Sequence, residues 1–281
     1  ADDKAQALFD NCFELISGPD APDLAIQELD RELILYLSNE NPLSNNYHEE
    51  YIAFDPGIPE FNENGQSIDT LQRSYTFQGY QIYQLADETV SPSDLDNINL
   101  ARLIFQCDVE DGISQLINYV QDPDMEIPVP FLMANGANEG IEHSFQVTSD
   151  AFAQGDNKLI NHKTYYFMAL AYGYNNYRTF NPGTGTGQDE QYKASRKSAT
   201  GSIRLFSAIP HKVDPEAGGT TLLANYGDGV VITRHEGRGN GINDLELTEE
   251  TIDNILNQTT VNEATYKAGH GPVNIKVIDP T

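Results

Sequence analysis

The stretch NHKTYYFMALAYGY, residues 161–174, decides the fold of this chain. Both sets of alternate positions carry apolar or aromatic side chains: Tyr165, Phe167, Ala169 and Ala171 in one set, and Tyr166, Met168, Leu170 and Tyr172 in the other. Alternation with a period of two, bounded by Asn and Gly, is typical of a β-strand and not of a helix. The sequence therefore predicts a strand of a half-buried sheet here.

A second run of this kind, YTFQGYQIYQL at residues 75–85, carries its apolar weight on Phe77, Tyr80, Ile82 and Leu85. Shorter strand-like runs include two that meet near Asp30 and others over 101–109, 116–121, 127–134, 141–152 and 201–207. Helix signals are few: Ser91 and Pro92 predict a short helix to about residue 100, and Thr248 caps the run LTEETIDNIL. The sequence thus predicts an all-β protein.

The chain of 281 residues is long enough for one large or two ordinary domains. We expect an N-terminal extension over 1–18, a β-sandwich with long insertions over 19–208, and a smaller α+β or β-rich unit over 209–281. The last unit offers only a strand at 227–237, the helix after Thr248 and a strand at 271–280, which make a thin core. It either packs against the sandwich or is truncated, and we favour truncation because VNIKVIDP reads as a strand entering further structure.

Charge is the most unusual feature of the composition. Asp and Glu number 43 against 16 Lys and Arg, which leaves a formal net charge of −27. A field of this sign repels phosphate, so we expect no nucleic-acid partner and no anionic membrane partner. No apolar run reaches the roughly 18 residues that a membrane-spanning helix needs, and the start ADDKAQALFDNC lacks the regions of an intact signal peptide. We therefore expect no insertion into a membrane.

Three segments together resemble a fibronectin type III-like module: PDAPDL at 19–24, FQGYQIYQL at 77–85 and KTYYFMALAY at 163–172, as strands A, C and F. The resemblance implies an immunoglobulin/fibronectin III-like β-sandwich, with strand E at 141–148 and strand G at 201–207. It also implies that Tyr165 is the corner tyrosine, whose hydroxyl satisfies backbone groups at the turn before the strand. The chain departs from the family in having no strand-B tryptophan and in spanning about twice the usual length.

The segments SGPDAPDL, ARLIFQ, NEGIEHSF and YGDGVVITRHEG also resemble the large surface proteins that surface-living, gliding bacteria export through the type IX secretion pathway. In such proteins, sandwich modules are strung along a long extracellular chain. The resemblance implies an extracellular or outer cell-surface location, and it does not imply an enzyme.

Motifs of catalysis are absent from the sequence. It has neither the nucleophile elbow G-x-S-x-G nor the zinc motif H-E-x-x-H, and no two of its six histidines stand four residues apart. The glycine runs at 183–187 and 237–241 are not followed by Lys-Ser or Lys-Thr, so we interpret them as turns and not as phosphate loops. We expect no enzymatic activity and no cofactor, with Ca²⁺ as the single candidate ion.

Two acidic turns are the candidate metal site. Asp108, Glu110 and Asp111 lie in one turn, and Asp122 and Asp124 in the other. Calcium takes about six to eight hard oxygen ligands, which carboxylates in a loop can supply. Neither turn fits the EF-hand template, so two interpretations stay open: solvated turn acids, or one bound Ca²⁺.

Cys12 and Cys107 have no metal-binding spacing. Two interpretations stay open for them as well. If the protein is exported they can form a disulfide that pins the N-terminal segment to the sheet, and otherwise they are separate thiols.

Tyr174 and Tyr177 form a candidate ligand face where the 161–174 strand leaves the sheet. The insertion over 39–74 is rich in Asn, Pro and Gly. Loops of this length in compact domains are usually functional or partly mobile. Together these features predict a non-catalytic structural, adhesion or interaction module, with other modules of the same long chain, an extracellular protein or a glycan as partner. The alternative is a carbohydrate-binding or accessory domain of a secreted hydrolase.

Overall fold

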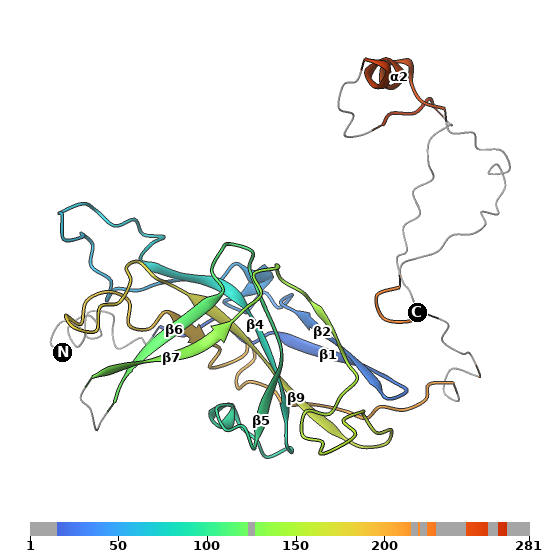
Figure 1. Cartoon of the computed structure of the whole chain (residues 1–281), viewed down its shortest axis with the longest axis horizontal. Coiled ribbons are helices and arrows are strands. Elements are labelled where there is room, and N and C mark those ends of the chain that lie inside the picture. Colours follow the sequence, from blue (N-terminus) through green and yellow to red (C-terminus); the bar gives the residue numbers. More distant parts are fainter. Residues whose placement is uncertain are drawn as a thin grey trace. The chain divides into compact units, whose positions relative to one another are not determined.

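The computed structural model describes residues 16–122, 127–214, 219, 224–228, 246–257 and 264–268. The chain divides into two compact units, residues 1–223 and residues 224–281 (Figure 1). The predicted boundary near residue 209 lies where the chain still pairs with the first unit, because His211 N donates to the Leu29 carbonyl at 3.0 Å. Of the two strands predicted in the last unit, 271–280 and nearly all of 227–237 lie outside the described residues.

The first unit is an all-β sandwich, as the alternating pattern predicts. Its smaller sheet has the order β1 (Asp23–Leu29), β2 (Glu32–Ser38), β8 (Ser144–Val147), and every neighbouring pair is antiparallel. β1 and β2 are the two short strands predicted to meet near Asp30. Arg31 completes the tight turn between them with a positive φ of 57°, a conformation that a turn imposes on few non-glycine residues.

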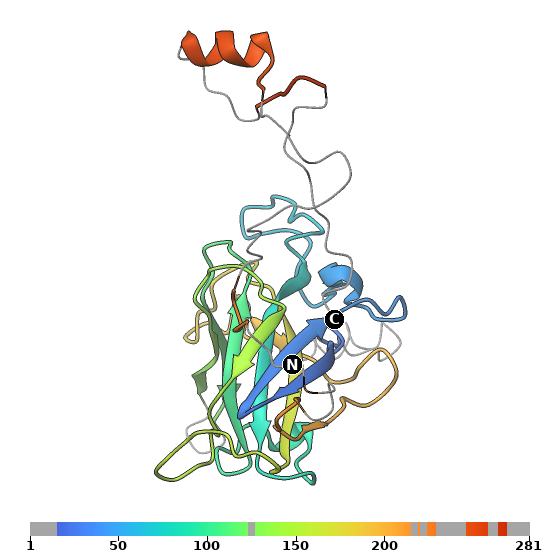
Figure 2. The same ribbon diagram turned by 90° about the vertical axis from the view of Figure 1, so that its right-hand side faces the viewer.

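The larger sheet is built on two long central strands, β4 (Ser74–Leu85) and β9 (Tyr165–Tyr174). β3 (Ile52–Phe54) and β5 (Ala101–Asp108) pair with successive halves of β4, and β10 (Tyr192–Ala194) and β11 (Phe206–Ala208) pair with β9. The strand predicted at 201–207 is therefore formed only from Phe206 onward. Figure 2 shows the blue β1 and β2 lying against this sheet.

Further elements of the first unit lie outside the two larger sheets. A separate hairpin consists of β6 (Gln115–Gln121) and β7 (Pro128–Asn135). The helix predicted from Ser91 to about residue 100 is wrong in length. Only the 3₁₀ turn η2 (Pro92–Asp94) forms, because the polar run after it makes turns such as the one in which Asn97 Oδ1 accepts the Asn99 N–H at 3.0 Å. A second 3₁₀ turn, η1, spans Tyr47–Glu49.

The helix of the second unit confirms its predicted cap. α2 spans Glu249–Leu256, and the side chain of Thr248 accepts a hydrogen bond from Thr251 N at 3.3 Å. This bond satisfies one of the amide donors that the first helical turn leaves unpaired. None of the helices in the described ranges is long and apolar enough to cross a bilayer.

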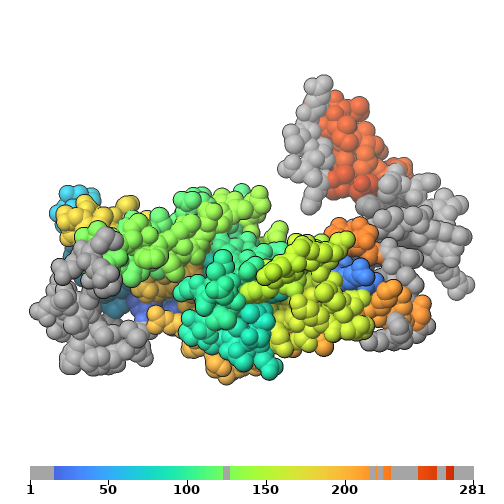
Figure 3. Space-filling view, turned by 60° about the horizontal axis from the view of Figure 1, so that its bottom comes forward, coloured from blue at the N-terminus to red at the C-terminus, as the bar shows by residue number. Residues whose placement is uncertain are grey.

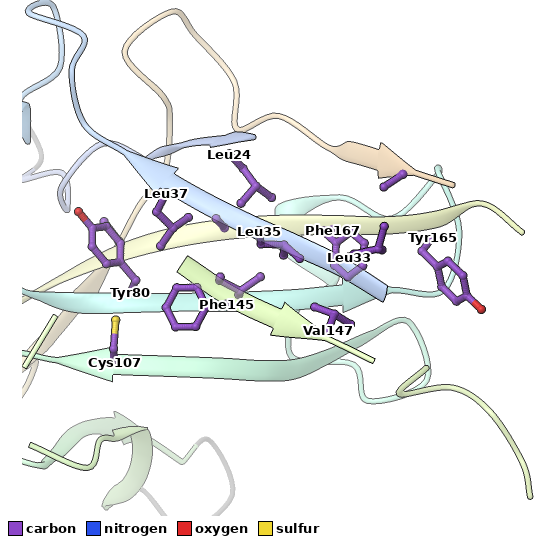
Figure 4. Close-up of a cluster of buried hydrophobic side chains, with 14 of the residues drawn as sticks. Leu24, Leu33, Leu35, Leu37, Tyr80, Cys107, Phe145, Val147, Tyr165 and Phe167 are labelled. Carbon is purple, nitrogen blue, oxygen red and sulfur yellow. The ribbon is translucent and has the colours of Figure 1, made fainter. Parts of the chain in front are cut away.

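The main core lies between the two sheets. Leu33 and Leu35 of β2 and Phe167 of β9 have no exposed surface, and Phe145 of β8 packs with them (Figure 4). These side chains lie at alternate positions of their strands, so they all point to the face between the two sheets. Burial of large apolar side chains here is the main source of sandwich stability.

The central strands are buried on both faces, and the prediction of a half-buried sheet is wrong in this respect. Tyr165, Phe167, Ala169 and Ala171 of β9 face the main core, whereas Met168 and Leu170 join a second cluster with Leu85, Val90 and Ile203. Tyr172 joins a third cluster with Leu116 and Ala134 of the β6–β7 hairpin. The second face of the sheet is thus covered by the hairpin and by the segments around Val90 and Ile203, which explains why both alternate sets of 165–172 are apolar.

A buried glutamine ties the hairpin to the sheet. The Gln81 amide nitrogen donates to Gln106 Oε1 at 3.0 Å and to the Met133 carbonyl at 3.1 Å, while its oxygen accepts the Tyr192 hydroxyl at 2.7 Å. The side chain therefore links β4, β5, β7 and β10. A buried amide is tolerated because its donors and acceptor are satisfied.

The hydroxyl of Tyr165 accepts the Ile160 backbone N–H at 2.9 Å, the bond expected of a corner tyrosine. Tyr165 and Leu159 are both buried. Tyr165→Phe should lower the free energy of unfolding by about 1–2 kcal/mol, because the Ile160 N–H loses its acceptor in a partly buried turn. Chemical denaturation measures the difference. Tyr166→Phe, whose half-buried ring lies on the opposite side of β9, is the matched control, and equal losses in the two variants would contradict the role of the hydroxyl.

Candidate functional site

Two loops at one end of the larger sheet fold as small hairpins. The first, residues 55–68, precedes β4 and turns at Asn62, whose side-chain oxygen accepts the N–H groups of Asn64 and Gln66, each at 3.0 Å. Its two arms are joined by the bond from Ile68 N to the Glu60 carbonyl at 2.8 Å. Asn and Gly in this loop provide the turn chemistry that the composition of the insertion suggests. We call this hairpin the first wall.

The second hairpin, residues 177–190, follows β9. Its arms are joined by the bonds from Asn181 N to Thr186 O at 2.8 Å and from Gln188 N to Arg178 O at 2.9 Å. Gly187 has a φ of +103°, and a Cβ there would lie 2.5 Å from the Thr179 carbonyl oxygen. The closed form of this hairpin therefore requires glycine at 187. We call it the second wall.

Between the two walls lies a cleft of about 1040 Å³, lined by residues of both hairpins together with the start of β4 and the region of β10. In Figure 3 the cyan side chains of the first wall and the gold side chains of the second adjoin at one end of the sandwich. The walls are more than 100 residues apart in sequence, and β4 and β9 bring them together because these strands pair along their length. The central strand pair thus positions the cleft.

Where β4 begins, the lining of the cleft contains a network of polar contacts around Tyr75. The Gln188 amide donates to the Tyr75 hydroxyl, which in turn donates to the Glu190 carbonyl oxygen. The Lys193 ammonium lies 5.0 Å from the centre of the Tyr75 ring and 2.7 Å from the Glu190 carboxylate. Burial is the first cause that raises the pKa of Tyr75, with the carboxylate of Glu190 second. The phenol therefore stays protonated and serves to hold the second wall.

One ion pair joins the two walls directly. Arg178 Nη1 of the second wall lies 2.7 Å from Glu63 Oε1 of the first. The two side chains are 41% and 71% exposed, so solvent screens the pair and its contribution to stability is below about 1 kcal/mol. The pair can open at little cost when a ligand enters.

The cleft is nearly balanced in charge, in contrast to the rest of the chain. Its lining has four acidic residues and three basic ones, whereas the chain as a whole has 43 and 16. Two of the four acids, Glu63 and Glu190, are paired with bases. The remaining lining combines carboxamides and hydroxyls with the rings of Phe61, Tyr75 and Tyr177 and with isoleucine and proline side chains. This arrangement can recognise a polar ligand through hydrogen bonds and ring contacts.

The two tyrosines of the predicted ligand face are separated in the structure. Tyr177 lines the cleft. Tyr174 does not; it is half-buried and packs against the cluster around Leu116, and burial raises the pKa of its hydroxyl. The structure thus does not bring Tyr174 and Tyr177 together on one cleft wall, because Tyr174 ends β9 against the hairpin cluster whereas Tyr177 lies in the loop that follows. A ligand face at Tyr177 stays a prediction.

The first acidic turn is held by its own hydrogen bonds. Asp108, at the end of β5, is buried and accepts the Asn138 N–H at 2.8 Å. Asp111 accepts the Gln78 amide at 3.1 Å and the Ile113 N–H at 2.9 Å. Glu110 is exposed. These contacts fix the positions of Asp108 and Asp111 in the turn.

The second acidic turn lies at the other end of the β6–β7 hairpin. Asp122 N donates to the Ile127 carbonyl at 3.0 Å, and Asp124 lies outside the described residues. Seven residues of strand, about 23 Å, separate Asp122 from the start of β6 near Asp111. Within the described ranges, no three His, Cys, Asp or Glu side chains converge on one point. The structure thus keeps Asp108 and Asp111 together and places Asp122 apart, and calcium binding stays a prediction.

Asp108 carries a testable pH dependence. Burial raises the pKa of its carboxyl, an effect that the Asn138 N–H opposes, and its Oδ2 atom has no hydrogen-bond partner. Because the folded-state pKa is raised, this group favours folding while protonated, below the unfolded pKa of about 3.9, and loses that contribution as pH rises through the folded pKa. Asp108→Asn should therefore raise the melting temperature at pH 7 and raise it less at pH 3.5. A difference that is constant between the two pH values would contradict this.

Of the two cysteines, only Cys107 lies in the part of the chain that the structure describes. Cys107 is a buried thiol whose sulfur lies 3.6 Å from the Glu142 carbonyl oxygen, and burial raises its pKa. Cys12 lies outside the described residues, so the predicted pairing is not tested. A raised thiol pKa makes Cys107 a poor nucleophile at neutral pH.

Most of the residues that line the cleft were not predicted as site residues from the sequence. Of the lining, only Tyr177 was predicted to contact a ligand. Phe61, Arg178 and Lys193 have no motif around them, and the only available signal was the unusual length of the insertion over 39–74. No protein-family model, no curated protein and no solved structure matches the chain.

Proposed function

We propose that the chain is a non-catalytic adhesion or interaction module of a secreted or cell-surface protein. Its sandwich is the stiff scaffold, and the cleft between the first and second walls is the binding site. The main support for the proposal is the cleft. Its volume of about 1040 Å³ and its mixed polar and aromatic lining are typical of ligand-binding sites.

The strand arrangement supports the fibronectin type III-like part of the proposal. In that family one sheet contains strands A, B and E, and here β1, β2 and β8 form a sheet in this order. β4 and β9 then correspond to strands C and F, and β10 and β11 share the place of strand G beside β9. The Tyr165 hydroxyl bond adds the corner feature.

Loops that carry recognition on a rigid sandwich are common, because the sheets fix their position while their sequences vary. The first wall is an insertion before strand C, and the second follows strand F. The expected partners are other modules of the same long chain or an extracellular protein or glycan, and the net charge of −27 keeps such a module soluble and repels anionic polymers.

Binding of the full chain to an array of purified extracellular polysaccharides, glycoproteins and peptides tests the proposal. Gly187→Ala should abolish the binding, because its Cβ would lie 2.5 Å from the Thr179 carbonyl and force the second wall open. The matched control is Gly183→Ala in the same loop, where the nearest atom is Asn181 Oδ1 at 3.3 Å. Absence of binding to every member of the array, or binding that survives Gly187→Ala, would refute the proposal.

A further inference from the structure

Part of the backbone of both walls is already paired. An extended peptide gains affinity by adding a strand to an open sheet edge. In the first wall the backbone N–H groups of Asn62 and Ile68 donate within the hairpin, at 2.8 Å each. In the second wall the N–H groups of Asn181 and Gln188 do the same. These inner edges are therefore closed to a peptide, and side chains of the lining offer a ligand further contacts.

Charge narrows the class of ligand further. A polyanion meets the field of a chain with a net charge of −27, and the three bases in the cleft are mostly engaged: Arg178 with Glu63 and Lys193 with Glu190. A polycation is not favoured in the cleft, because bases nearly balance acids in its lining whereas the chain as a whole is strongly acidic. The cleft therefore favours a ligand without net charge.

The side chains that remain suit a sugar ring. Phe61 of the first wall is 55% exposed, and Tyr177 lies on the second wall. An aromatic ring packs against the C–H face of a pyranose, while carboxamides such as those of Asn64 and Gln72 can bond the hydroxyls around its edge. Single small ligands occupy pockets of about 300–1,000 Å³, and the cleft lies at or above the upper end of that range. It has room for several linked sugars.

We propose that the cleft binds a neutral oligosaccharide of several pyranose units, held between Phe61 and Tyr177. This inference rests on the proposed function and specifies the ligand of the same site. The Arg178–Glu63 pair, which joins the walls across the cleft, opens to admit the chain of sugars.

Isothermal titration of the full chain with neutral hexasaccharides of glucose, mannose and xylose tests the inference. The comparison ligands are an anionic galacturonate oligomer, a cationic glucosamine oligomer and an extended uncharged peptide. At least one neutral sugar should bind. Phe61→Ala and Tyr177→Ala should each weaken that binding by about five- to tenfold, the effect of losing one ring contact.

Phe131→Ala is the matched control, because this phenylalanine is 51% exposed on β7 and does not line the cleft. It should leave the affinity unchanged, and melting curves confirm that all three variants are folded. If a charged oligomer or the peptide binds in a Phe61-dependent way while every neutral sugar fails, the sugar inference is overturned and the interaction module stands. If no ligand binds, the sugar inference falls, and the interaction module is then decided by the array of polysaccharides, glycoproteins and peptides. Sugar binding that is unaffected by Phe61→Ala and Tyr177→Ala overturns the placement in the cleft.

Discussion

Phe167→Ala is expected to lower the free energy of unfolding of the sandwich by about 3–5 kcal/mol. The side chain has no exposed surface and lies at the centre of the main core, between the two sheets. Its β9 position is paired with Gln84 of β4 on one side and with Phe206 of β11 on the other, so the surrounding strands cannot close over the cavity without breaking pairs. The loss thus combines transfer free energy with an unfilled cavity.

Thermal unfolding followed by circular dichroism measures this effect as a fall of about 10 °C for a unit of this size. Phe131→Ala, which removes the same atoms from an exposed position on β7, should change the free energy of unfolding by no more than about 0.5 kcal/mol. Equal shifts in the two variants would show that Phe167 does not lie in a packed core.

Gly79→Ala is expected to destabilise the sandwich by about 3 kcal/mol through overpacking. A Cβ at this position would lie 2.2 Å from the Cys107 carbonyl oxygen and 2.6 Å from the Tyr172 hydroxyl. The first of these atoms belongs to the backbone of β5 and cannot rotate away. Relief requires β4 and β5 to separate where Gly79 pairs with Asp108.

Urea denaturation measures the free energy of unfolding of Gly79→Ala and of the control Gly183→Ala, in which the added methyl group meets no backbone atom. At Gly183 the φ angle is ordinary and the single close atom belongs to a side chain, so a change within about 0.5 kcal/mol is expected there. A Gly79→Ala variant as stable as the control would mean that the two strands lie further apart at this point than described.

The all-β class and the main strands could be predicted from the sequence, because the local period of apolar residues and the composition indicate β-strands. The 165–172 pattern predicts β9, and the Thr248 signal predicts α2. What it could not show is which segments cover the second face of β9. Two apolar alternate sets are typical of a strand that is buried on both faces, but the covering segment, the β6–β7 hairpin, is placed by the tertiary structure alone.

The candidate site was less accessible to sequence reasoning for a different physical reason. The first wall and the second wall are each ordinary turn-rich loops, and nothing local marks them as neighbours. They meet because Thr76 of β4 pairs with Tyr174 of β9, a register that depends on the whole sheet. The separation of Asp122 from Asp111, by contrast, follows from local structure, because strand β6 lies between the two acidic turns.

The amide of Gln81 has a consequence for how the sandwich opens. The β6–β7 hairpin cannot detach while the sheet persists without breaking the bond from Gln81 to the Met133 carbonyl and exposing the cluster of Leu116 and Ala134 to water. Hairpin and sheet should therefore unfold as one cooperative block. In native-state amide exchange, the protected protons of β6 and of β4 should then share a single opening free energy.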